Sequence, residues 1–211
     1  MKPYKTVRQA ANDEFIINKS RFIGYASPAE TEEEALAFLQ SIRQKHKDAN
    51  HNCYAYVIGL NAGIMRYNDD GEPGGTAGLP IMEVLKARGV VNVCVVVTRY
   101  FGGILLGAGG LVRAYTQGCV TALKAAEVVT MEPSVRYLCE VAYPQWDRVH
   151  HALRSLPAQL LSSKFTTAVT FTLLMREGDA STVLDELTRM TDGRLEALLE
   201  EELFFPWAVS N

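Results

Sequence analysis

The chain has 211 residues, of which 48% are hydrophobic and 21% are charged, a composition typical of soluble globular proteins rather than disordered, collagenous or membrane proteins. No apolar run reaches the roughly 18 residues that a membrane span needs, and no apolar segment follows the first positive charges as in a secretory signal. We therefore expect a cytoplasmic protein of one or two domains that does not bind a membrane.

Charge is distributed unevenly along the chain, whose net charge is −3. Residues 1–130 hold 14 Lys/Arg and 12 Asp/Glu, whereas residues 131–211 hold 7 and 12. This balance excludes a protein that coats a polyanion with its whole surface. The four cysteines are widely spaced and form no CxxC pair, which favours buried free thiols over disulfides or metal ligands.

Strands and helices alternate in the first part of the chain. Residues 31–47 are predicted to be a helix, because a threonine precedes a glutamate-rich first turn and apolar residues follow at helical spacing. Two further helices each follow a glycine-rich segment, at 79–88 and 110–127. The predicted strands are rich in β-branched and aromatic residues and lie at 14–18, 21–25, 52–59, 64–67 and 90–98.

The pattern changes at residues 131–134, which we predict to be a domain boundary between 1–130 and 131–211. The second part is predicted to be a strand (135–142), a helix (144–156), two strands (158–164 and 166–175), a helix (179–190) and a strand (194–203). This βαββαβ order is that of a ferredoxin-like domain, so the predicted fold class is α+β. Such a domain serves too many functions to indicate one by itself.

The first glycine-rich segment, residues 69–78, contains three acids and leads into a predicted helix. Its glycines permit positive φ or close approach, Thr76 could cap the helix, and backbone amides at a helix start can hold a phosphate. Asp69, Asp70 and Glu72 would repel a phosphate unless a divalent cation lay between them. The alternative is a tight loop whose acids are solvated or cap the helix.

The second glycine-rich segment, residues 98–110, joins a predicted strand to the longest helix. It lacks the GxxxxGK[ST] pattern of a P-loop. Arg99, Tyr100, Arg113 and Tyr115 lie near its glycines in sequence, and such residues beside free amides suit phosphate, stacked bases or an acidic partner. In the alternative interpretation the glycines permit close packing and the arginines are ordinary surface residues.

Catalytic signatures are sparse. His51 and Cys53 are two residues apart on a predicted strand and so point the same way, which permits an imidazole to activate a thiol. The apolar context favours a structural role instead. GxSxG, HExxH and GxGxxG patterns are absent, and we predict no catalytic residue, metal ligand or cofactor.

Four motifs, at residues 20–22, 51–56, 69–78 and 99–115, together resemble the IMPACT family, in its bacterial YigZ-like branch. The resemblance covers about residues 15–126. It implies that the first domain is similar to domain 2 of ribosomal protein S5, and that the second resembles the last domain of the ribosomal translocase. It also implies a role in translation, since the eukaryotic branch binds a ribosome-associated activator of the amino-acid starvation kinase.

We therefore expect a non-enzymatic binding or regulatory protein of translation that contacts RNA, the ribosome or a ribosome-associated protein. One alternative is an enzyme acting on a phosphorylated small molecule with a metal held by the three acids, and another is a protein adaptor that binds a basic partner through the ferredoxin-like sheet. The predicted binding residues are Arg21, Asp69, Asp70, Gly71, Glu72, Thr76, Gly78, Arg99, Tyr100, Gly102, Gly103, Gly107, Gly109, Gly110, Arg113 and Tyr115.

Overall fold

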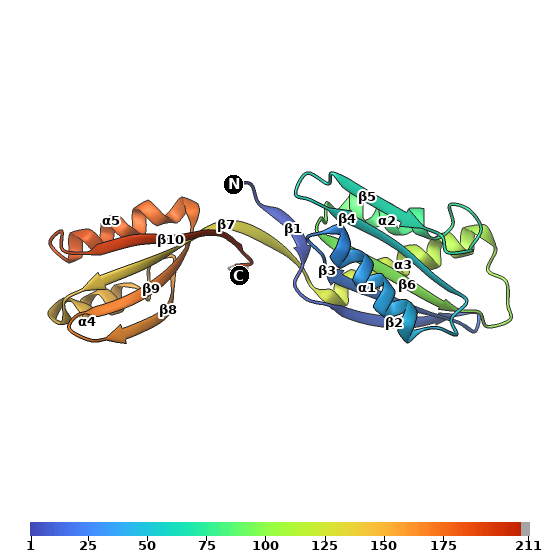
Figure 1. The fold of residues 1–211 in the computed structure, drawn as a ribbon, viewed down its shortest axis with the longest axis horizontal. Helices are drawn as coiled ribbons and strands as arrows, with labels where there is room; N and C mark the ends of the chain where they lie inside the picture. Colours follow the sequence, from blue (N-terminus) through green and yellow to red (C-terminus); the bar gives the residue numbers. More distant parts are fainter. Residues whose placement is uncertain (208–211) are drawn as a thin grey trace. The chain divides into compact units, whose positions relative to one another are not determined.

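The computed structural model describes residues 1–207 and divides into two compact units. One unit is Tyr4–Thr130, and the other begins at Met131 and includes Met1–Pro3. Both units combine strands and helices (Figure 1), so the fold class is α+β. Residues 131–134 lie inside strand β7 (Val128–Val141) rather than in a loop between domains.

The first unit is built on an antiparallel sheet with strand order β2-β3-β6-β4-β5. Its central strand is β6, whose residues 93–99 are all buried because helices cover both of its faces. A short strand that the sequence did not indicate, β1 (Tyr4–Val7), precedes the sheet. The sheet strands are β2 (Ala11–Ile17), β3 (Ser20–Pro28), β4 (His51–Ile58), β5 (Ile64–Asn68) and β6 (Val93–Tyr100).

Helix α1 (Glu32–Lys45) packs on one face of this sheet, and α2 (Gly78–Arg88) with α3 (Gly107–Ala126) packs on the other (Figure 1). Side chains of a strand alternate between faces, so Cys94 and Val96 join the apolar cluster under α1, whereas Val95 and Val97 join the cluster under α2 and α3. The continuous apolar run of β6 therefore serves two cores.

The ends of the helices follow local chemistry. Thr31 caps α1 as predicted, because its side chain accepts a hydrogen bond from the Glu34 amide at 3.2 Å. Helix α3 begins at Gly107, three residues before the predicted start, and β6 ends at Tyr100 rather than at residue 98. The loop between them is therefore shorter than the sequence pattern suggested.

The second unit has the order β7-α4-β8-β9-α5-β10, and its antiparallel sheet runs β10-β7-β9-β8. This is the ferredoxin-like arrangement that the sequence predicted. Trp146, 8% exposed, packs in its core against Phe171. The remaining elements are α4 (Tyr143–Ala152), β8 (Ala158–Phe165), β9 (Val169–Arg176), a 3-10 turn (Glu177–Asp179), α5 (Ala180–Met190) and β10 (Glu196–Phe205).

The four cysteines are free and buried in the two units, as predicted. Within residues 1–207, no helix combines the length and the hydrophobicity that crossing a membrane requires.

Candidate functional site

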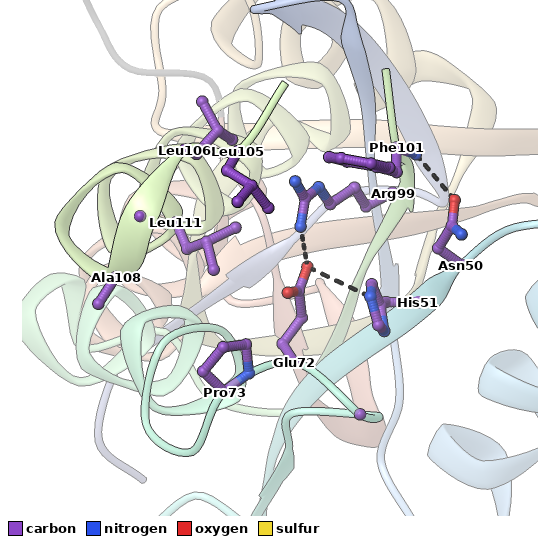
Figure 2. Close-up of a pocket in the computed structure, with 12 residues that line it drawn as sticks. Asn50, His51, Glu72, Pro73, Arg99, Phe101, Leu105, Leu106, Ala108 and Leu111 are labelled. Carbon is purple, nitrogen blue, oxygen red and sulfur yellow. Dashed lines mark hydrogen bonds and ion pairs between the residues drawn. The ribbon is translucent and has the colours of Figure 1, made fainter. Parts of the chain in front are cut away.

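A pocket of about 420 Å³ opens in the first unit between the two glycine-rich segments. Its walls are mostly hydrocarbon, and its base is polar (Figure 2). His51, Glu72 and Arg99 form the base. The apolar walls are Pro73, Phe101, Leu105, Leu106 and Leu111.

Arg99 is buried at the pocket base, with only 5% of its surface exposed. Its Nη1 donates a hydrogen bond to Oε1 of Glu72 at 2.8 Å. The guanidinium also lies over the rings of Phe22 and Phe101, 5.5 and 5.4 Å from their centroids, where the ring faces attract a cation. Arg99 therefore holds a buried ion pair together and is not the surface cation that the sequence predicted.

Glu72 connects three segments of the unit. Besides Arg99, the hydroxyl of Tyr115 donates to its Oε1 at 2.7 Å, and Nε2 of His51 lies 3.8 Å away. Burial raises the pKa of Tyr115, so the phenol remains a neutral donor. Tyr115 is fully buried and cannot contact a bound partner, which corrects its predicted binding role.

His51 is fixed by the loop beside it. Its Nδ1 lies 2.9 Å from the carbonyl oxygen of Asp70, and because a carbonyl only accepts, Nδ1 carries a proton. Cys53, on the same face of β4, donates its thiol hydrogen to the carbonyl of Asp69 at 2.9 Å. Burial raises the pKa of Cys53, so the thiol is not activated as a nucleophile.

Asp69 fills the anion site at the start of α2. Its Oδ1 accepts from the amides of Ala77 and Gly78 at 3.1 and 2.8 Å, and its Oδ2 accepts from the amide of Gly75 at 2.9 Å. Thr76 does not cap this helix, because its hydroxyl donates to the carbonyl of Pro73. The amides predicted to hold a phosphate are thus satisfied by the chain's own carboxylate.

The other acids of this segment bind different donors. Oδ2 of Asp70 accepts from the amide of Asn52 at 2.7 Å, and its Oδ1 pairs with Arg43 at 3.1 Å. The three carboxylates of the segment therefore point to three separate sets of protein donors. Among residues 1–207, no group of three or more His, Cys, Asp or Glu side chains is arranged to hold a metal ion.

Tyr100 and Arg21 lie on the opposite face of the sheet from Arg99. The hydroxyl of Tyr100 donates to Asp48 at 3.2 Å, and the guanidinium of Arg21 lies over the Tyr100 ring while pairing with Glu14 at 2.6 Å. Neighbouring strand residues point to opposite faces. The predicted grouping of Arg21, Arg99 and Tyr100 on one surface is therefore wrong.

Several predicted glycines have backbone roles. A Cβ on Gly78 would lie 2.7 Å from the Asn68 backbone, and one on Gly102 would lie 2.0 Å from the Lys19 backbone, so both permit close approach. Positive φ angles occur at Gly71, Gly103 and Gly107, whereas Gly109 and Gly110 lie in the first turn of α3. These contacts support the packing interpretation of the glycines.

Exposed apolar side chains distinguish the second segment. Leu105 is 86% exposed, and Phe101 and Ile104 are also exposed. No side chain caps α3, whose preceding residue is Leu106. None of these residues was among the predicted binding residues, although an Ile-Leu-Leu run between two glycines in a loop is a sequence signal for exposed apolar side chains.

Comparisons with known proteins cover both units. The family described as Impact N-terminal domain matches residues 18–123, and a domain of unknown function, DUF1949, matches residues 139–194. IMPACT family member YvyE of Bacillus subtilis is 39% identical over 208 residues, 99% of this chain and 96% of its own. The chain belongs to the IMPACT family.

Other relatives support the bacterial IMPACT architecture. Escherichia coli YigZ is 35% identical over 188 residues, covering 88% of this chain and 92% of its own. A solved structure titled as that of a hypothetical protein is 32% identical, covers 95% of this chain and 98% of its own, and has a TM-score of 0.60. The matched residues 18–123 enclose both glycine-rich segments and the pocket.

Proposed function

We propose that this IMPACT family member is a non-enzymatic binding protein of translation that docks on the ribosome or on a ribosome-associated protein. The observation that carries the proposal is the exposed apolar segment at residues 101–106, which borders an apolar pocket. Clustered exposed apolar side chains mark interaction surfaces. The resemblance to proteins of translational control supplies the cellular context.

A protein surface suits this face better than RNA. RNA affinity needs several cations free to neutralise phosphates, but Arg99 is buried against Glu72 and Arg21 pairs with Glu14. Arg113 is exposed on α3, and a single arginine gives a small phosphate contribution. Apolar and aromatic side chains around a pocket are typical of a protein interface.

Co-sedimentation with ribosomes that retain their associated proteins, and with their subunits, across a salt series tests the proposal. We expect Leu105→Asp to weaken binding at least about tenfold, because a charge would be buried against an apolar partner. Leu36→Asp is the matched control, since Leu36 is an exposed leucine on α1, on the other face of the sheet. Absence of binding at every salt concentration would refute the proposal, and binding that falls steeply with salt would indicate RNA instead.

A further inference from the structure

The polar base of the pocket keeps hydrogen-bonding capacity that the chain does not use. Oε1 of Glu72 accepts from Arg99 and Tyr115, but none of the described residues donates to Oε2. Figure 2 shows this second oxygen turned towards the space between Pro73 and Leu111. Glu72 therefore presents an acceptor to the pocket interior.

Arg99 supplies donors beside this acceptor. Among the described residues, the guanidinium donates only through Nη1, to Glu72, so both N–H groups of Nη2 remain available to a ligand. Nε also has no partner among the described residues, but it is inaccessible to solvent, so an acceptor in the pocket would bind the guanidinium through Nη2. The guanidinium lies over the rings of Phe101 and Phe22, and these contacts restrict its position.

Charge at the base is balanced, which limits the ligands that fit. Arg99 and Glu72 neutralise each other, and the other lining residues include no lysine, aspartate or further arginine. A ligand anion would face the Glu72 carboxylate, and a ligand cation would face Arg99, within walls that screen charge poorly. A neutral group that both donates and accepts avoids both penalties.

We infer that the pocket binds the carboxamide of an asparagine or glutamine side chain in a protein segment with apolar neighbours. A carboxamide carries an N–H donor and a carbonyl acceptor on one planar end, which complements Glu72 and Arg99. The flanking apolar side chains would cover Leu105 and Phe101. This inference rests on the proposed function only in taking the pocket as a docking site.

Full-length ¹⁵N-labelled protein, titrated with short peptides, tests the inference by NMR. Acetyl-Leu-Gln-Leu-N-methylamide should shift the amide signals of residues 71–73 and 105–111, whereas acetyl-Leu-Glu-Leu-N-methylamide should bind at least about tenfold more weakly, because its carboxylate would face Glu72. Glu72→Gln retains an oxygen for Arg99 and Tyr115 but replaces the free oxygen with NH₂. We expect the preference for the glutamine peptide to disappear in this variant.

Ala108→Trp provides a second variant, because it narrows the pocket without altering the polar base, and it should abolish peptide binding. Equal affinity for the two peptides, a preference unchanged by Glu72→Gln, or no shift with either peptide would overturn the inference. Shifts at these residues with hexauridylate alone would assign the pocket to RNA and also overturn it. Selective peptide binding without ribosome co-sedimentation would refute the translation role but leave this inference intact.

Discussion

Both glycine-rich segments of the first unit lead into helices, but only the helix after the first segment has its N-terminal amides capped by a side chain. At residues 69–78, Asp69 binds three backbone amides and closes the start of α2. At residues 101–107, no side chain caps α3, and Leu105 is exposed to solvent. Residues 74–78 of the first segment are therefore structural, and the exposed residues of the second segment are the better candidates for contact with a partner.

The difference arises from the composition of the two loops. The first contains acids, and a carboxylate at a helix N-terminus satisfies its amides and interacts favourably with the helix dipole. The second contains glycine and leucine, which offer no acceptor side chain. The two glycine-rich segments therefore differ in whether a side chain of the chain itself already binds the backbone amides at the start of the following helix.

The largest loss of stability is expected from removing Arg99, whose side chain joins the two glycine-rich segments through Glu72. Arg99→Ala leaves Glu72 buried without its charged partner, and breaking such a pair costs about 3–5 kcal/mol. Hydrogen exchange of the β6 amides should show this loss as faster exchange. Unchanged exchange would contradict the structural role given to Arg99.

A smaller loss should follow removal of the α2 cap. Asp69→Ala leaves the amides of Gly75, Ala77 and Gly78 without their acceptor, and the expected cost is about 2 kcal/mol. The measurement is exchange of the α2 amides, with α1 amides as the internal reference. If α2 is unaffected, the first segment is not the closed structure described above.

A pH dependence of stability should arise on the face of the sheet that α1 covers. Burial and the nearby Lys45 lower the pKa of His46, which contacts the hydroxyls of Tyr25 and Tyr100 at 2.6 and 2.8 Å. Since the unfolded chain then binds more protons than the folded one, stability is lost as pH falls below about 6.5. His46→Gln should reduce this slope in denaturation measured between pH 8 and 5; an identical slope would exclude His46 as its source.

The smallest effect on stability and binding is expected at Arg113, one of the binding residues predicted from the sequence. Arg113→Ala should change stability by no more than about 0.5 kcal/mol, because the side chain is exposed. It should also change ribosome affinity less than Leu105→Asp does. If Arg113→Ala instead causes a large loss of ribosome affinity, and the loss is greater at low salt than at high salt, this face binds through electrostatic contacts.

Many elements of the fold could be predicted from local patterns in the amino-acid sequence. The cap at Thr31, the two-sided apolar run of β6 and the βαββαβ order all depend on residues close in sequence. The pairing of Arg99 with Glu72 spans 27 positions and depends on where a loop folds back, which no local pattern encodes.

Other errors concern side-chain direction and the ends of elements. Strand alternation places Tyr100 and Arg99 on opposite faces, but the strand was predicted to end at residue 98, which left both residues in a loop. Capping by Asp69 was harder to foresee, because the acid lies eight positions before Ala77 and reaches the helix only through the turn between them.

Hydrogen exchange of the ribosome-bound protein, compared with the free protein, tests the contrast between the two segments most directly. We predict that residues 101–110 become protected on binding, while residues 74–78 exchange as before because Asp69 already holds their amides. Protection confined to residues 74–78, or to strands β7 and β10 of the second unit, would contradict the assignment of the binding surface to the second glycine-rich segment.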